Sequence, residues 1–125
     1  MRRFIIPVAV IALAGVGGPA LAHPRLVSAD PAPNAAVGSV NGVRLAFSER
    51  LLASFSKADL LLTSTPTARL SAPIHLQSRL ALSSNGRGLI VTPTKRLVTG
   101  SYRLTYRVVS ADTHRIQGGY AFTVK

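Results

Sequence analysis

The chain has 125 residues, 15 lysines and arginines against four aspartates and glutamates, a formal net charge of +11 and no cysteine. This length favours a single domain, and the absence of cysteine excludes disulfides, iron–sulfur clusters, thiolate zinc sites and a cysteine nucleophile. A hydrophobic content of 47% with only 15% charged residues is too apolar for a disordered tail.

The first 22 residues are typical of a secretory signal peptide. A short basic start (1–3) precedes an uncharged apolar stretch (4–18), and Ala20-Leu21-Ala22 presents small residues where a signal peptidase cleaves. A membrane anchor is the alternative, since about 20 apolar residues span a bilayer, but the cleavage pattern falls where an anchor would still continue. We therefore expect a secreted domain of residues 23–125, not an integral membrane protein, with its net charge lowered from +11 to +9 by the loss of two arginines.

Downstream of the leader, apolar and polar residues alternate in short runs, which is typical of strands with one face on a core. The residues expected to face inward are Val43, Leu45, Phe47, Ala58, Leu60, Leu62, Ile74, Leu76, Leu80, Leu82, Leu89, Val91, Tyr102, Leu104, Tyr106, Val108, Tyr120, Phe122 and Val124. Turn-forming residues separate the runs at 30–34, 41–42, 65–66, 83–86 and 118–119. The stretch 49–57 fits either a helical turn or a loop.

About seven short strands in a domain of this length predict an all-β fold, a Greek-key β-sandwich or barrel. Leu97-x-x-Gly100-x-Tyr102 resembles the tyrosine corner of immunoglobulin-like Greek-key sandwiches. Such a fold does not identify a function, so the functional argument depends on individual residues.

The three histidines of the chain differ in their surroundings. His75 lies on the polar face of an alternating run, where a solvated surface residue is the usual explanation. Cleavage after residue 22 would make His23 the first residue, so that its α-amine and imidazole form a chelate for a metal ion. Pro24 has no backbone N–H for Cu(II) to deprotonate, so further ligands must come from elsewhere.

Asp112-Thr113-His114 offers those ligands, since residues i and i+2 of an extended segment point to the same side. Together with His23 they supply three nitrogens and one oxygen, and a tetragonal site of this kind favours Cu(II). The only methionine is Met1, which argues against a Cu(I) site. Asp-x-His is common by chance, so the hypothesis depends on its combination with an N-terminal histidine.

Two end motifs resemble the CopC/PcoC family of periplasmic copper-resistance proteins. They are His23-Pro24-Arg25-Leu26-Val27-Ser28 and Tyr106-x-Val108-Val109-Ser110-x-Asp112-Thr113-His114-x-x-x-Gly118-x-x-x-Phe122-x-Val124, with Phe47-Ser48-Glu49 between them. The resemblance covers residues 23–125 and implies a cupredoxin-like β-sandwich that is not an enzyme. It implies one Cu(II) ion per mature chain, held by the amine and imidazole of His23, the carboxylate of Asp112 and the imidazole of His114. Glu49 would lie beside the ion or bind it weakly as an axial ligand.

The resemblance also implies a periplasmic protein that sequesters or delivers copper for copper homeostasis and resistance, with a CopD-like inner-membrane protein as a partner. Some family members bind Cu(I) through a methionine-rich loop that also carries a histidine. The matching stretch 62–70 contains neither residue type. The resemblance is therefore to the Cu(II)-only branch.

Two other functions remain open. Lytic polysaccharide monooxygenases also use an N-terminal histidine to chelate copper, but this chain has no tryptophan to stack on a sugar and little surface for a polymer. A basic secreted interaction module is the second alternative, because a strong positive charge suits anionic surfaces or acidic partners. Secretion removes nucleic acid as a partner, and the arginines are spread along the chain without a tight cluster.

Overall fold

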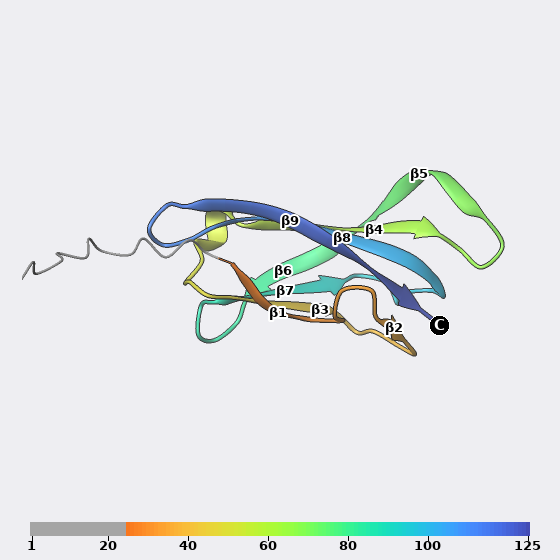
Figure 1. The fold of residues 1–125 in the computed structure, drawn as a ribbon, viewed down its shortest axis with the longest axis horizontal. Helices are drawn as coiled ribbons and strands as arrows, with labels where there is room; N and C mark the ends of the chain where they lie inside the picture. The colour runs from red at the N-terminus through yellow and green to blue at the C-terminus, as the bar shows by residue number, and fades with distance from the viewer. Residues whose placement is uncertain (1–24) are drawn as a thin grey trace, which may run out of the picture.

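The computed structural model describes residues 25–125 as two β-sheets packed face to face (Figure 1). The expected leader and His23 lie outside the described residues. The described part contains nine strands and one short 3₁₀ helix: β1 (Leu26–Asp30), β2 (Ala36–Val37), β3 (Val43–Phe47), η1 (Ala53–Phe55), β4 (Lys57–Ser64), β5 (Arg69–Leu76), β6 (Ser78–Leu82), β7 (Gly88–Pro93), β8 (Gly100–Val109) and β9 (Arg115–Val124). The predicted all-β sandwich is confirmed, with nine strands rather than about seven.

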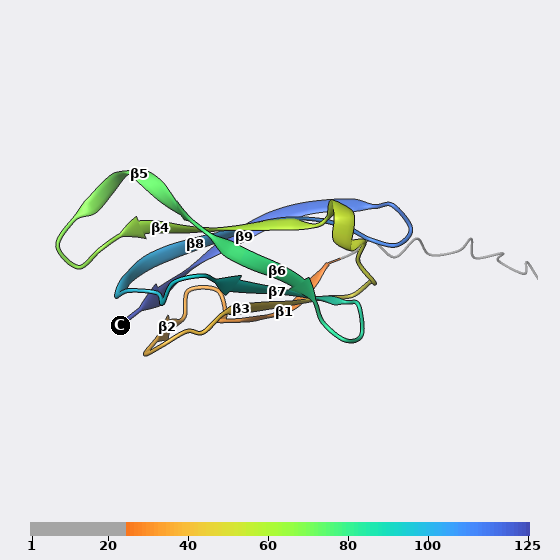
Figure 2. The same ribbon diagram turned by 180° about the vertical axis from the view of Figure 1, so that it is seen from behind.

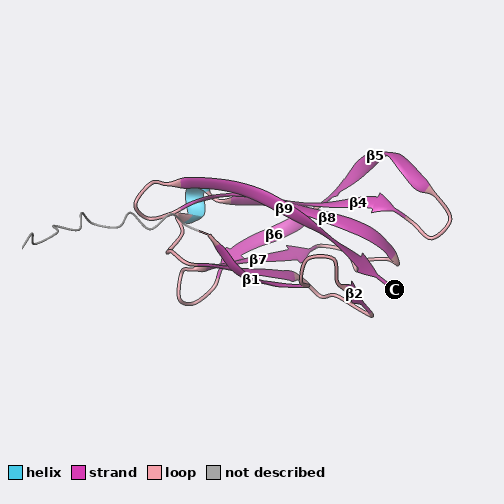
Figure 3. Cartoon of the chain, in the orientation of Figure 1, coloured by secondary structure: helices cyan, strands magenta, loops and turns pink. Residues whose placement is uncertain are grey.

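One sheet has the strand order β1-β3-β7-β6 and the other has the order β2-β9-β8-β4-β5. Figure 2 shows the two layers from behind, and Figure 3 shows the short helix η1 at one end of the sandwich, next to the β8–β9 loop. The β8–β9 pair forms an antiparallel ladder that runs without a register shift from Gly100↔Val124 to Val109↔Arg115. This uninterrupted ladder carries the β8–β9 loop at its end.

The expected alternation of buried and exposed residues is present in most strands. The inward side chains of β3, β4, β7, β8 and β9 form one core with these members: Val43, Leu45, Phe47, Leu60, Leu62, Leu89, Val91, Tyr102, Leu104, Val108, Tyr120, Phe122 and Val124. Tyr106 is only partly buried and packs at the margin of this core. Period-two patterning therefore identified the faces of these strands correctly.

The run from Ile74 to Leu82 is the main exception to the predicted pattern. It is not one strand, because β5 pairs with β4 in one sheet and β6 pairs with β7 in the other. The β4–β5 hairpin projects past the facing sheet (Figure 1), so the Ile74 side chain has little to pack against and is 49% exposed. Leu80 lies on the edge strand β6 and is 40% exposed.

Gly118 and Gly119 were expected to form a turn, and this expectation is wrong. Both lie inside β9, where Gly118 faces Tyr106 and a Cβ atom on Gly118 would collide with the Tyr106 hydroxyl. The Tyr106 ring in turn packs edge-on against Phe47, with ring centroids 5.3 Å apart. Glycine is thus needed here for the close approach of an aromatic ring and not for backbone freedom.

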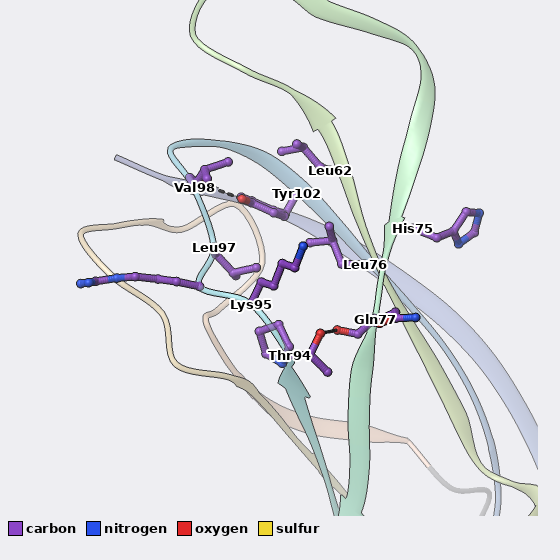
Figure 4. Close-up of a pocket in the computed structure, with 11 residues that line it drawn as sticks. Leu62, His75, Leu76, Gln77, Thr94, Lys95, Leu97, Val98 and Tyr102 are labelled. Atoms are coloured by element: carbon purple, nitrogen blue, oxygen red, sulfur yellow. Dashed lines mark hydrogen bonds between the residues drawn. The ribbon is translucent and has the colours of Figure 1, made fainter.

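The predicted tyrosine corner is present at the start of β8. The Tyr102 hydroxyl donates a hydrogen bond of 2.6 Å to the backbone carbonyl of Val98, four residues upstream (Figure 4). The Tyr102 ring is 1% exposed and stacks on Phe122, with ring centroids 5.5 Å apart. This contact fixes the entry of the chain into the longest ladder of the fold.

Candidate metal centre

A tight turn joins β8 to β9 and contains two of the predicted ligands. The Ser110 N–H donates to the carbonyl of His114 at 2.9 Å, and the Thr113 N–H donates to the carbonyl of Ser110 at 2.8 Å. Thr113 has a φ of 69°, a left-handed conformation that few non-glycine residues adopt. Asp112 and His114 are therefore brought together by a turn, and the expectation that they lie on an extended segment is wrong.

Within this turn, the Asp112 carboxylate contacts two side chains at once. Its Oδ2 lies 2.8 Å from Nδ1 of His114, and its Oδ1 accepts a hydrogen bond from the Ser110 hydroxyl. The side chains of His114 and Asp112 are 35% and 49% exposed. A nitrogen donor and an oxygen donor therefore lie side by side at the surface, where an ion from solvent can reach them.

Electrostatics keep the Asp112 carboxylate charged. The hydrogen bond that it accepts from Ser110, followed by the one that it accepts from His114, lowers the pKa of Asp112 to about 2. Hydrogen bonds to the charged form of a carboxyl group stabilise that form. Asp112 is thus an anion across the physiological range, the form in which a carboxylate binds a metal ion.

Ser110, for which the sequence predicted no role, lies at the base of this arrangement. Ser110 is fully buried, and its hydroxyl holds Asp112 while its backbone closes the turn. An isolated bridge pairs Ser110 with Leu51. In the sequence, this role of Ser110 is indicated only by the spacing Ser-x-Asp-x-His, which places a small hydroxyl two residues before the carboxylate.

The start of β1 lies at the same end of the sandwich as this turn (Figure 1). The Arg25 N–H donates to Ser48 Oγ at 3.0 Å, and the Ser48 N–H donates to the Arg25 carbonyl at 2.9 Å. Two residues further on, the Arg50 carbonyl accepts a 2.8 Å hydrogen bond from the N–H of Ala111. The segment 48–50 therefore connects the beginning of the described chain to the turn.

Glu49 is half-buried in the middle of this connecting segment. It lies between Ser48, which holds Arg25, and Arg50, which contacts the turn. The structure thus places Asp112, His114 and the Glu49 segment at one end of the molecule. His23, the remaining predicted ligand, lies outside the described residues.

The Asp112–His114 pair is not a complete site by itself. Within residues 25–125, no group of three or more histidine, aspartate or glutamate side chains is arranged to hold an ion. Two donors leave most positions around a tetragonal ion to be filled. Any tight site at this turn needs ligands from beyond the described part of the chain.

His75 lies far from the turn. It is exposed on β5, opposite Leu61 of β4, and Leu61 pairs in turn with Arg103 of β8, seven residues before Ser110. His75 borders a cavity of about 360 Å³, and Figure 4 shows its imidazole directed to the opposite side of β5 from Leu76. The expectation that His75 is a surface residue agrees with this placement.

The β4–β5 loop forms a shallow hollow at the end of the molecule remote from the turn. Its lining consists of Thr63, Ser64, Thr65, Pro66, Thr67, Ala68, Arg69 and Ser101. These side chains carry neither a thioether nor an imidazole, and hydroxyl oxygens are poor ligands for a soft monovalent ion.

In the described residues there is also no helix long and apolar enough to cross a membrane.

Comparisons with known proteins agree on one family. A model described as the CopC domain matches residues 26–125. Copper resistance protein C of Xanthomonas campestris pv. juglandis is 41% identical over 124 residues, covering 99% of this chain and 97% of the relative. The crystal structure of PcoC, a methionine-rich copper resistance protein from Escherichia coli, matches with a TM-score of 0.75 and 36% identity over 83% of this chain and all of PcoC.

A third match is the crystal structure of CopC from Methylosinus trichosporium OB3b, with a TM-score of 0.65 and 29% identity over 82% of this chain and 94% of that one. The curated relative is named for copper resistance and not for a reaction, which agrees with the expectation that the chain is not an enzyme. The family model spans nearly all of the described residues, and the two solved structures have the same fold as this chain. The chain therefore belongs to the CopC family.

Proposed function

We propose that this protein binds one Cu(II) ion in the periplasm and sequesters or delivers it in copper homeostasis and resistance. The ligands are the amine and imidazole of His23, the carboxylate of Asp112 and the imidazole of His114. Membership of a family whose relatives are named for copper resistance supports copper as the metal. Three nitrogens and one oxygen suit the tetragonal preference of Cu(II).

The observation that carries this proposal is the 2.8 Å contact between Asp112 and His114 at the end of the sandwich where the described chain begins. Arg25 is tied to Ser48 at this end, and two further residues reach at most about 7 Å. The proposal requires that this reach bring the donors of His23 to the turn. The Nδ1–Oδ2 contact keeps the imidazole and the carboxylate next to each other, and an ion bound by both groups would replace this contact.

The chelate depends on removal of the leader. Residues 1–22 carry the features of a signal peptide, and cleavage after Ala22 exposes the α-amine of His23. The amine has an ordinary pKa of about 7.7–8.0, so a metal ion competes with its proton at neutral pH. Until it is processed, the chain lacks one of the four donors.

Glu49 is a further group beside the proposed site. Its segment joins Arg25 to the turn through hydrogen bonds at Ser48 and Arg50. We assign to it either a hydrogen bond to a ligand or weak axial binding. Its substitution is expected to change copper affinity less than substitution of His114.

Cu(II) is the only oxidation state that we propose for tight binding. PcoC is described as methionine-rich, whereas the single methionine of this chain is Met1. The β4–β5 hollow offers only hydroxyl, proline, alanine and arginine side chains. The protein would therefore pass its ion on as Cu(II), with a CopD-like inner-membrane protein as the proposed recipient.

A Cu(II) titration followed by EPR tests the proposal with two proteins, one beginning at His23 and one with a single alanine before it. We expect a one-to-one site with nitrogen hyperfine structure in the first protein and a strongly weakened site in the second. Equal, weak binding by both would exclude the N-terminal chelate. A parallel titration with Cu(I) should show no stoichiometric site, and a tight one would exclude the Cu(II)-only assignment.

A further inference from the structure

The outer face of the five-stranded sheet carries a groove that leads to the 110–114 turn. Two hollows form it, of about 540 Å³ and 410 Å³, and they share Lys57 and Arg107 in their walls. The first lies over β4, β8 and β9, and the second continues between η1 and the turn, where Thr113 contributes to its lining. We call these two hollows together the basic groove.

A missing side chain explains the depth of the first hollow. Asp59, Thr105 and Gly119 form one row across the three strands, and Gly119 has no Cβ to fill its place. A Cβ there would lie 2.7 Å from the Leu104 carbonyl oxygen, so no larger residue fits without a backbone shift. The depression is therefore built into the backbone pairing of β8 and β9.

The walls of the basic groove are cationic. Lys57, Arg103, Arg107 and Arg115 are all exposed along it, and among the described residues Asp59 is the one acidic residue that lines it. No lysine or arginine in residues 25–125 forms an ion pair with a carboxylate, since the ion pair found there joins His114 and Asp112. The groove thus presents positive charge that the described chain does not neutralise.

Two of these cations are arranged at a cost in stability. Lys57 and Arg107 face each other directly across β4 and β8, and like charges in directly opposed positions destabilise a sheet. An anionic group bound between them would convert this repulsion into attraction. The pair is therefore suited to an external carboxylate.

The far wall of the basic groove is apolar. Phe55 in η1 is 64% exposed and lines the second hollow together with Leu52 and Val109. Exposed aromatic residues beside arginines are typical of protein interaction sites. Toward the turn, the basic groove thus presents first the cationic side chains of the first hollow and then the apolar wall of the second.

We infer that the basic groove binds an acidic, extended segment of a partner protein, whose carboxylates contact Lys57, Arg103 and Arg107 and whose apolar residue packs on Phe55. The groove follows β8 from Arg103 to Val109, a span of about 20 Å at about 3.3 Å per residue, which suits about six extended residues. A hollow of this length fits a peptide better than a flat bilayer surface. The bound segment would end beside Thr113, so that, given the proposed function, the partner lies next to the copper ligands.

The test uses metal-free protein expressed from the whole 125-residue chain and a fluorescein-labelled octapeptide. Glutamate occupies every second position of the first six residues of the peptide, and its last two residues are leucines. Fluorescence anisotropy at constant ionic strength should show saturable binding. The double variant Lys57→Glu/Arg107→Glu should weaken it at least about tenfold. The variant Arg69→Glu/Arg79→Glu, which changes the net charge equally at exposed positions outside the groove, should change it less than about twofold.

The apolar wall is tested without a change of charge. Phe55→Ser should weaken peptide binding about fivefold, whereas Val98→Ser, at an apolar side chain of similar exposure elsewhere, should leave it unchanged. Amide chemical shifts should move in residues 52–59 and 103–119 when the peptide is added. Cu(II) binding by the same variants is measured separately, so that failure of the groove and failure of the copper site can be distinguished.

Three results would overturn the inference. Equal loss of peptide binding in both charge-reversal variants would show that the peptide responds to the net charge of the protein and not to the groove. Chemical-shift changes outside the groove would place the peptide elsewhere. Binding to vesicles containing anionic phosphatidylglycerol, lost on Lys57→Glu/Arg107→Glu, together with no binding of the peptide, would identify the surface as a membrane contact.

Discussion

Arg25 and Ser48 hold each other through two hydrogen bonds, one from the Arg25 N–H to the Ser48 hydroxyl at 3.0 Å and one from the Ser48 N–H to the Arg25 carbonyl at 2.9 Å. Only the first depends on the serine side chain. This pair fixes the point at which the chain enters β1, two residues after the proposed chelating residue His23.

Replacing Ser48 by alanine should therefore weaken Cu(II) binding severalfold, because the N-terminal ligand is less well placed, while the free energy of unfolding falls by about 1 kcal/mol. Competition titration with a Cu(II) chelator and urea unfolding of the metal-free protein measure the two effects. Ser84→Ala, at an exposed serine of the 83–86 turn, is the matched control. A loss of stability with unchanged copper affinity would show that the hydrogen bonds between Arg25 and Ser48 serve folding alone.

Substitution of the proposed histidine ligands separates them from the third histidine. Loss of a hydrogen-bond partner of a ligand already costs about 10–100-fold in metal affinity, so His114→Ala and His23→Ala should each cost more than about 100-fold. His75→Ala should have no effect, because His75 is exposed on β5 at the level of Arg103, seven residues along β8 from Ser110. Equal losses in the three variants, measured by the same chelator competition, would contradict the proposed site.

Ser110→Ala tests the support of the carboxylate. The Ser110 hydroxyl is the main reason that the pKa of Asp112 is lowered to about 2, so this pKa should rise toward the ordinary aspartate value of about 3.9 in an NMR titration. Copper affinity should fall about 10–100-fold, as for other partners of metal ligands.

The effect of Ser110→Ala on the free energy of unfolding should depend on pH. A carboxyl group whose pKa is lower in the folded state stabilises the protein above its unfolded-state pKa, and this contribution is lost as the pH falls toward the folded-state value. The stability difference between the metal-free wild type and Ser110→Ala should therefore be largest above about pH 4 and shrink as the pH approaches 2. Urea unfolding between pH 2 and 6 measures it, and a difference that does not vary with pH would show that Asp112 is not its cause.

The tyrosines of the core should respond in opposite directions to loss of the hydroxyl. The Tyr120 hydroxyl is buried and has no hydrogen-bond partner among residues 25–125, and burial raises its pKa to about 12. Tyr120→Phe should therefore raise the free energy of unfolding by about 1 kcal/mol. Tyr102→Phe loses the bond to the Val98 carbonyl and should lower it by about the same amount. Thermal unfolding compares the two, and a destabilised Tyr120→Phe would indicate that its hydroxyl is hydrogen-bonded in solution.

The fold was predictable where one local rule applied throughout a strand. Alternation identified the buried faces of β3 and β8 because these strands lie in the middle of their sheets and have a core on one side. It failed for Ile74 and Leu80, because periodicity does not show that a chain changes sheets between two strands. The turn expected at Gly118 and Gly119 was wrong for another reason, since the ring that needs the space at Gly118, Tyr106, lies twelve residues away on another strand.

For the candidate site, the meeting of Asp112 and His114 was predictable from the sequence, but the geometry of their meeting was not. The spacing of Asp112 and His114 indicated that they meet, yet it suggested an extended segment. The left-handed conformation of Thr113 brings them together instead. The Ser-x-Asp-x-His spacing places the Ser110 hydroxyl close to the carboxylate in sequence, but its burial and its hydrogen bond to Asp112 follow from the way the turn folds back on itself. The basic groove required the register of three strands, which no local pattern supplies.

The two halves of the proposed site belong to parts of the fold with different local stability. The 110–114 turn closes the uninterrupted β8–β9 ladder, whereas β1 is an edge strand whose one partner among the described strands is β3. Segments paired on one side open more readily than central ones, so β1 should fray and exchange its amide hydrogens well before the turn does. Detachment of this single strand would withdraw the N-terminal donors and release an ion while the rest of the sandwich stays folded.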